Sequence, residues 1–195
     1  MFQRLVLAAA FAAVVPVSVV HAQRPTFSGP AISGYLCCNM RSYGNTVSDV
    51  NYDEAAQPLA IGTPVQVTGY EFRWFDANVG GKAQRFKNDY SRDVPMTEFA
   101  RRYVVTEDPK IKLAGFEPAV REAIVAGRLL PGMTRDQVAM ALGWPIASEN
   151  PRLEAPVWRY WLSAFTEYQV LFDAQGKVRK VSGDSNAVER VWNAP

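Results

Sequence analysis

Residues 132–145 carry the most regular pattern of apolar and polar positions in the chain, and the pattern is that of one short helix. Thr134 is followed three residues later by Gln137, which is the spacing of a capping box. In such a box the threonine hydroxyl accepts the glutamine backbone N–H, and the glutamine side chain reaches back. Met133 and Val138 occupy the two positions of a hydrophobic staple. The sequence therefore predicts a helix that begins directly after Thr134.

The end of the same helix is also marked. Gly143 suits the left-handed residue that often follows a helix, and Pro145 cannot continue one. Ala141 and Leu142 share a helical face with Val138 and form a stripe for burial. Capping and packing account for Met133, Thr134, Gln137 and Gly143, so we assign these four residues a structural role.

Apolar periodicity predicts a second helix and three strands around this one. Residues 117–127 have helical spacing, and residues 157–163, 167–173 and 177–182 alternate as strands. Gly176 fits a hairpin turn between the last two strands. Residues after 182 are polar up to Val188 and predict a terminal strap or a short helix. We expect residues 109–195 to form an α+β domain with two helices and a three-stranded antiparallel sheet.

The first half of the chain shows mainly strand patterns. Short strands are expected at 35–40 and 47–52, a long strand within 58–75, and its partner at 83–87. The alternation in the long strand changes phase at Gly69, which indicates a β-bulge or a sharp bend. Residues 93–103 have helical spacing, and the polar residues 106–110 suggest a domain boundary. We expect residues 35–108 to be a mainly β region, preceded by a flexible leader at 23–34.

Residues 1–22 have the pattern of a secretory signal peptide: Arg4 near the start, an apolar run, and a small residue, Ala22, at the cleavage site. The apolar run is too short for a membrane span, and no later run is long enough, so we expect no transmembrane span after cleavage. The 21 basic residues fall to 20 when Arg4 is removed, against 19 acidic residues, so the mature net charge is +1. This balance argues against nucleic acid as a partner.

Cleavage also removes His21, the only histidine. Without histidine, neither a Ser-His-Asp triad nor a Cys-His pair can form. Imidazole zinc ligands are excluded, and two cysteines cannot supply a four-thiolate site. We therefore expect no catalytic residue, no metal site and no cofactor, and we expect that the protein is not an enzyme.

The two cysteines, Cys37 and Cys38, are adjacent. An exported protein meets an oxidising compartment, where disulfides form. Three states are open: two buried small residues, a disulfide between neighbours, or a link to another chain. Residues 34–36 are Gly, Tyr and Leu rather than the small residues of a lipobox, so lipid attachment at Cys37 is not expected.

Residues 118–182 resemble the SmpA/OmlA family, the BamE-like domain of the outer-membrane assembly machinery. The order of the motifs along the chain carries the resemblance: Gly132-Met133-Thr134, Gln137-Val138, Leu142-Gly143 with Pro145, Trp158 with Tyr160, and Phe172-Asp173 with Gly176-Lys177-Val178. The family implies a fold of two helices and three strands, similar to the repeat of β-lactamase inhibitor proteins, and a binding or scaffolding role in the Gram-negative envelope without catalysis or cofactor. BamE is a lipoprotein, whereas no lipobox is recognised in this sequence, which favours a soluble periplasmic protein over a membrane-anchored assembly subunit and leaves association with the outer membrane open. Separately, residues 62–67 resemble the opening of bacterial SH3-like modules, which would make the first region a small barrel.

Aromatic and basic residues on the polar side of a strand are the candidates for partner binding. Arg159 and Trp161 lie opposite Trp158 and Tyr160 in the predicted strand, and Trp and Arg are enriched at interface hot spots. Trp192 belongs to the same candidate set. The alternative is that Trp161 packs under the C-terminal strap against Trp192.

Three hypotheses for function follow. The first is a non-catalytic envelope module that binds proteins, such as envelope or assembly components, and supports outer-membrane assembly or integrity. The second is a periplasmic enzyme inhibitor with the β-lactamase-inhibitor-like fold. The third is a thiol-dependent redox protein that uses Cys37 and Cys38, although neither the Cys-x-x-Cys spacing nor a nearby histidine is present to stabilise a thiolate.

Overall fold

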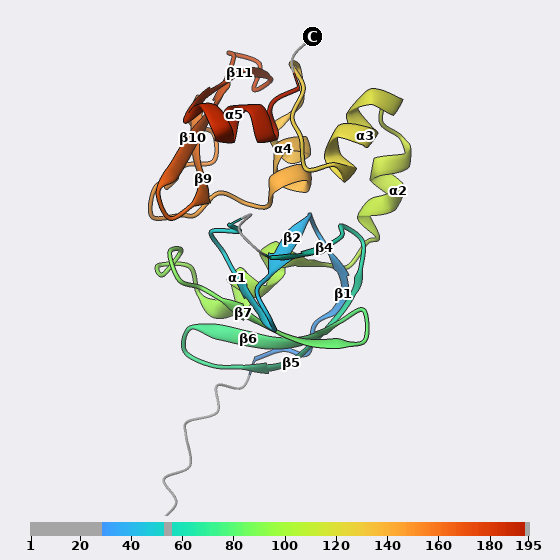
Figure 1. The fold of residues 1–195 in the computed structure, drawn as a ribbon. Coiled ribbons are helices and arrows are strands. Elements are labelled where there is room, and N and C mark those ends of the chain that lie inside the picture. The colour runs from blue at the N-terminus through green and yellow to red at the C-terminus, as the bar shows by residue number, and fades with distance from the viewer. Residues whose placement is uncertain (1–28, 53–55, 194–195) are drawn as a thin grey trace, which may run out of the picture.

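The computed structural model describes residues 29–52 and 56–193. The expected signal peptide at 1–22 and the first part of the leader lie outside these ranges. Figure 1 shows two lobes stacked one on the other, an N-terminal lobe up to about residue 105 and a C-terminal lobe after it. The fold mixes helices and strands, and the α+β class is confirmed at that level. In the described residues, no helix is both long and apolar enough to cross a membrane.

The N-terminal lobe is a curled sheet (Figure 1). Its strands are β1 (Ser33–Leu36), β2 (Met40–Ser42), β3 (Thr46–Ser48), β4 (Gln57–Leu59), β5 (Pro64–Tyr70), β6 (Trp74–Val79), β7 (Lys82–Lys87) and β8 (Val104–Val105). Six of them pair in the order β3-β7-β6-β5-β1-β8, and β2 pairs with β4. Only the β3–β7 pairing is parallel among these strands. Ser33 and Gly34 already belong to β1, so the first strand begins two residues before the predicted end of the leader at 23–34.

The long strand expected within 58–75 is wrong, because the chain reverses inside it. Residues 71–73 form a turn closed by the backbone hydrogen bond from Glu71 N–H to Trp74 C=O, 2.8 Å. β5 and β6 are therefore antiparallel neighbours, and Phe72, expected in the alternating apolar face, is exposed in the turn. The irregularity predicted at Gly69 is confirmed, since the β5–β6 register shifts between Val67 and Gly69.

Aromatic side chains fill the core of the N-terminal lobe. Phe75 on β6 and Phe86 on β7 are stacked with ring centroids 4.7 Å apart. Helix α1 (Met96–Tyr103), expected at 93–103, adds Phe99 and Tyr103 at centroid distances of 6.0 Å from Phe75 and 6.1 Å from Phe86. All four rings are buried. The curled sheet thus has a core of its own, separate from that of the other lobe.

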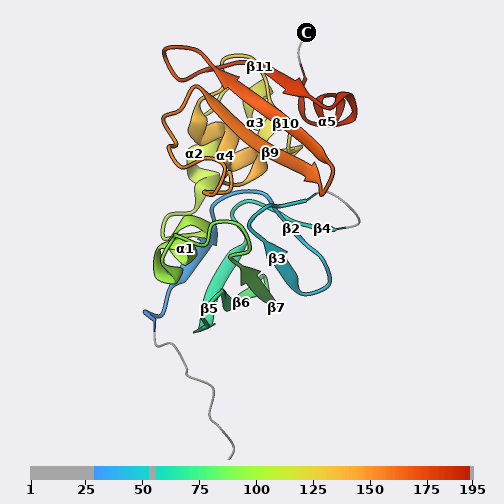
Figure 2. The ribbon, with the colours of Figure 1, turned by 90° about the vertical axis from the view of Figure 1, so that its left-hand side faces the viewer.

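The C-terminal lobe packs helices against a second sheet. Its elements are α2 (Pro109–Ala114), α3 (Pro118–Val125), α4 (Arg135–Leu142), β9 (Val157–Ser163), β10 (Thr166–Phe172), β11 (Val178–Gly183) and α5 (Ser185–Val191). The three strands are antiparallel in the order β11-β10-β9, as predicted. Figure 2 shows this sheet lying across the helices, and its buried face includes Trp158, Tyr160, Tyr168 and Phe172. The segment expected to be a strap or a short helix forms α5.

Helix α4 has the ends that the sequence predicts. Gln137 N–H donates to Thr134 Oγ1 at 3.2 Å, and Thr134 N–H donates to Gln137 Oε1 at 2.8 Å, which completes the capping box. Met133 and Val138, the staple residues, are both buried. Gly143 follows the helix with a φ of 83°, a value that favours glycine. The side chains of these residues are engaged in the cap and in the core beneath the helix.

Helix α2 was not predicted. Its N-cap is Asp108, whose side chain accepts the Lys110 backbone N–H at 2.9 Å, and Pro109 occupies the first helical position. Asp followed by Pro is a helix start signal, but residues 106–110 were interpreted only as a boundary. The C-terminal lobe therefore has more helices than the two expected.

Two asparagines join the lobes. Asn39, just before β2, donates from its side chain to the Ile124 C=O at 2.6 Å and the Ala141 C=O at 3.3 Å. Its side-chain oxygen accepts the Ile61 N–H at 3.1 Å. Asn51 donates to the Leu142 C=O at 2.8 Å. Because the side chains come from one lobe and satisfy helix-end carbonyls of the other, they fix how the lobes meet.

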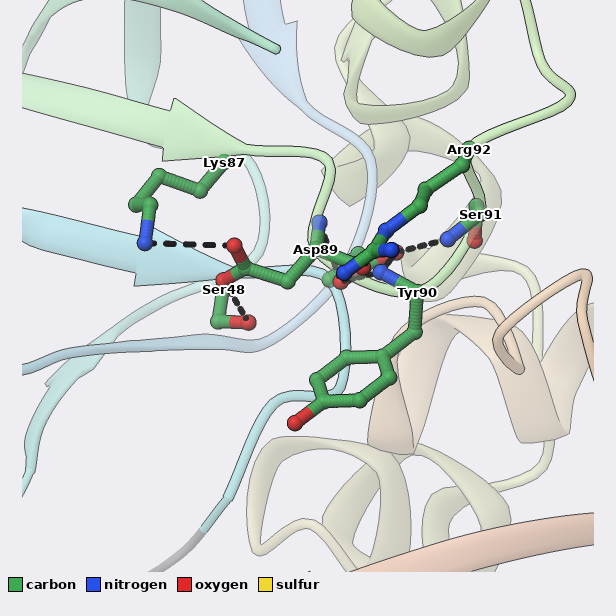
Figure 3. A network of polar contacts seen from close by, with 7 residues as sticks. Ser48, Lys87, Asp89, Tyr90, Ser91 and Arg92 are labelled. Atoms are coloured by element: carbon green, nitrogen blue, oxygen red, sulfur yellow. Dashed lines mark hydrogen bonds and ion pairs between the residues drawn. The ribbon is translucent and has the colours of Figure 1, made fainter.

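A buried carboxylate organises the loop after β7. Asp49 accepts the backbone N–H groups of residues 89–91 at distances of 2.7 to 3.2 Å. Figure 3 shows the loop and its outer contacts, in which Asp89 bonds to Ser48 Oγ at 2.8 Å and pairs with Lys87 Nζ at 3.1 Å. Desolvation by burial raises the pKa of Asp49, although these N–H groups oppose that effect. The network shapes this loop, and the loop also bonds to the C-terminal lobe: Ala147 N–H donates to Ser91 Oγ at 3.0 Å, and Ser148 N–H donates to the Tyr90 C=O at 3.3 Å.

Candidate binding groove

A groove of about 500 Å³ lies where the two lobes meet. Clefts of this size between domains are common binding sites. Its apolar surface draws on both lobes, with Cys37, Cys38 and Val105 from the N-terminal lobe and Ile111, Met140 and Trp144 from the C-terminal lobe. Neither lobe could form this groove alone.

The floor contains a disulfide between neighbouring residues. Cys37 and Cys38 are bonded to each other, with exposed fractions of 9% and 1%. Of the three states that the sequence left open, the structure has the disulfide between neighbours. The backbone is held on both sides of it: Cys37 N–H donates to the Tyr103 C=O at 2.9 Å, and Asn39 N–H donates to the Met140 C=O at 3.0 Å. The disulfide therefore sits in a segment of the N-terminal lobe whose backbone is hydrogen-bonded to both lobes.

One wall of the groove is the short helix α2. The cap at Asp108 and the proline at its first position fix where this helix starts. Leu113 faces the core and is buried, whereas Ile111 is 76% exposed beside the groove. A single exposed isoleucine is ordinary, but here it adjoins other apolar groups that are open to the same cleft. The combination makes a continuous apolar contact surface.

Trp144 lines the groove and lies in the turn after α4. Its indole N–H donates to the Arg102 C=O at 3.0 Å, and its ring lies 6.5 Å from that of Trp158. The preceding residue, Gly143, takes the positive φ that directs the chain out of the helix, and its C=O accepts the Tyr160 hydroxyl at 3.1 Å. The capped helix thus contributes to the site indirectly, by placing Trp144.

The rim of the groove is mainly acidic. Lys112 Nζ pairs with Asp136 Oδ2 at 3.0 Å, and both side chains are largely exposed. Asp108 uses one oxygen for the helix cap. Within the described residues, Glu107 has no ion-pair partner. Three carboxylates and one ammonium group therefore border the groove, a local excess of negative charge.

The residues predicted to bind a partner lie elsewhere. Arg159 and Trp161 are together on the outer face of β9, where Arg159 Nε pairs with Glu167 Oε1 at 3.1 Å and Trp161 Nε1 donates to Glu149 Oε2 at 2.9 Å. Trp192 follows α5 and packs against the core of the C-terminal lobe. No ring contact joins Trp161 and Trp192 in the described part of the chain. The structure thus brings together two of the three candidates, and it ties both to glutamates of their own lobe.

The groove offers contact surface more than reactive groups. The large pKa shifts fall on buried tyrosines: desolvation raises the pKa of Tyr103 and of Tyr160, and both hydroxyls stay protonated at neutral pH. Neither residue is open to the groove. Across residues 29–52 and 56–193, no group of three or more His, Cys, Asp or Glu side chains is arranged to hold a metal ion. What the site presents is an apolar floor between charged edges.

The sequence patterns did not predict this groove. Ile111 and Trp144 are 33 positions apart in the chain, and only the packing of the folded protein brings both to one groove. The available signal was the Asp108–Pro109 helix start, which would have shown an apolar residue on a short helix beside the boundary. The chain matches no family model, and no curated protein and no solved structure is significantly similar to it.

Proposed function

We propose that this protein is a non-catalytic binding module of the Gram-negative cell envelope, exported by its signal peptide to the periplasm. It supports outer-membrane assembly or integrity by binding another protein. The SmpA/OmlA-like order of motifs in residues 118–182 and the export signal in residues 1–22 support the compartment and the general role. The three-stranded sheet packed on capped helices is compatible with that resemblance.

The observation that carries the proposal is the groove between the lobes. It has the volume of a binding cleft, an apolar surface to which both lobes contribute, and walls held by the disulfide, by the Asp108 cap and by the Trp144 hydrogen bond. A surface that is already held in one shape binds with less loss of conformational entropy. We therefore place the partner here, not on the outer face of β9, where Arg159 and Trp161 are already engaged.

The inhibitor hypothesis is less well supported by the same surfaces. It would be favoured by an aromatic-lined face on the three-stranded sheet. The described outer face instead carries the Arg159–Glu167 and Trp161–Glu149 contacts, which are polar and exposed.

Photocrosslinking in living cells tests the proposal. A photoreactive amino acid is placed at Ile111 in the groove, at Trp161 on the outer sheet face, and at Val125, an exposed apolar position on α3 away from both. We expect one defined protein adduct from position 111 and none from position 125, and we expect that deletion of the gene weakens the outer-membrane permeability barrier. Adducts only from position 161, or an intact barrier with no adduct at all, would count against the proposal.

A further inference from the structure

We infer that the groove takes a short apolar segment of a partner protein that is flanked by lysine or arginine. This inference rests on the proposed function and adds the chemistry of the partner.

Charge complementarity selects the flanks. Lys112 and Asp136 neutralise each other at 3.0 Å, which leaves Glu107 and Asp108 as the net charge of the rim. A segment that brings basic residues to this rim gains attraction, whereas acidic flanks would be repelled. The same sign disfavours an anionic lipid surface as the occupant.

The floor selects an apolar centre with adaptable contacts. The lining residues include Cys37, Cys38, Met140 and Trp144, residue types with polarisable sulfur or aromatic groups that pack well against varied side chains. Ile111 adds the largest exposed apolar surface at the edge. The volume of about 500 Å³ suits a short segment and not the flat face of a folded domain.

The partner segment should enter a cleft that changes little on binding. The chain is held at both ends of the disulfide by bonds from Cys37 N–H and Asn39 N–H, and Trp144 is held through its indole N–H. Because the cleft is already held in one shape, binding requires little conformational rearrangement of the protein. Differences in affinity between segments then come from the side chains of the segments.

Selection from a library of short random peptides displayed on phage tests this inference with the purified protein. We expect enrichment of sequences in which one or two large apolar residues are flanked by Lys or Arg, and an affinity for the selected peptide that falls as salt is added. In Ile111→Ser the affinity should fall about tenfold or more, since burial of one isoleucine is lost. In Glu107→Lys it should fall about fivefold, because one attraction becomes a repulsion. Val125→Ser and Glu122→Lys, matched changes at exposed positions of α3, should leave it unchanged.

The possible outcomes separate this inference from the proposed function. Enrichment of acidic or uncharged peptides, no enrichment, or binding that both groove variants leave intact would overturn the basic-flank inference. Groove-dependent binding to vesicles that contain phosphatidylglycerol would overturn it in favour of a membrane ligand. In each of these cases an adduct from position 111 in cells would still support the proposed function.

Discussion

Replacing Asn39 with alanine should weaken the whole molecule, because this side chain alone bonds three separate segments. It donates to the Ile124 C=O at 2.6 Å and the Ala141 C=O at 3.3 Å, and it accepts the Ile61 N–H at 3.1 Å. Each such bond contributes about 1 kcal/mol net, and the three partner groups belong to buried residues. We therefore expect Asn39→Ala to lower the free energy of unfolding by about 3 to 4 kcal/mol.

Urea unfolding followed by tryptophan fluorescence measures this loss. With a slope of about 2 kcal/mol per molar urea, a loss of about 3 to 4 kcal/mol lowers the transition midpoint by about 1.5 to 2 molar. Asn78→Ala is the matched control, since Asn78 makes one bond, from the Gly81 N–H at 2.8 Å, in an exposed turn. The control should lose no more than about 1 kcal/mol. Asn39→Asp keeps the acceptor for Ile61 but turns a carboxylate towards two carbonyl oxygens, so it should lose at least as much as Asn39→Ala.

A clear result would refute this reasoning. If Asn39→Ala lost no more stability than Asn78→Ala, the three bonds across the lobes would not be contributing to folding. Equal stability of Asn39→Asp and the parent protein would show that the side-chain amide is not donating to the helix-end carbonyls. Either finding would also remove the main reason for a fixed groove between the lobes.

Three further changes test other parts of the structure. Thr134→Ala removes the α4 cap and should lower the free energy of unfolding, measured in urea, by about 1 kcal/mol. Thr68→Ala, at an exposed strand position, is the control and should lower it much less. Equal losses in the two variants would contradict the capping role. Reducing the Cys37–Cys38 bond opens a ring between adjacent residues, and the chain-entropy relation for so small a ring gives a loss of only about 1 kcal/mol in the free energy of unfolding. Urea unfolding with and without dithiothreitol measures this loss. A loss above about 3 kcal/mol would be inconsistent with the relation. Burial raises the pKa of the Asp49 carboxyl group in the folded state. The native state therefore binds a proton at Asp49 more tightly than the unfolded state does. As a result, the contribution of Asp49 to the free energy of unfolding grows as the pH falls through the folded pKa. The parent protein should therefore gain stability relative to Asp49→Asn as the pH is lowered from neutral towards 4; the opposite trend would show that the backbone N–H donors outweigh burial.

Local signals predicted the C-terminal lobe well. The helix after Thr134, the three strands and the turn at Gly176 all lie close to their expected positions, because capping and alternation act between residues that are near in sequence. The N-terminal lobe was predicted less well. The turn at residues 71–73 contains no glycine, proline or asparagine, so no turn signal interrupts the alternation of apolar residues there. The alternation therefore predicted one long strand where the structure has two.

Sequence alone determined the elements that are stabilised by contacts between neighbouring residues, namely the capped helix and the alternating strands of the second sheet. It also showed that residues 23–195 contain no histidine. Only the tertiary structure decided the groove. Its residues come from β8, α2 and α4 and from the segments after β1, β8 and α4, and they meet where Asn39 and Asn51 bond helix-end carbonyls of the other lobe. Contacts of that kind join positions 85 to 102 residues apart, and they depend on the folded positions of both partners, which no local pattern records.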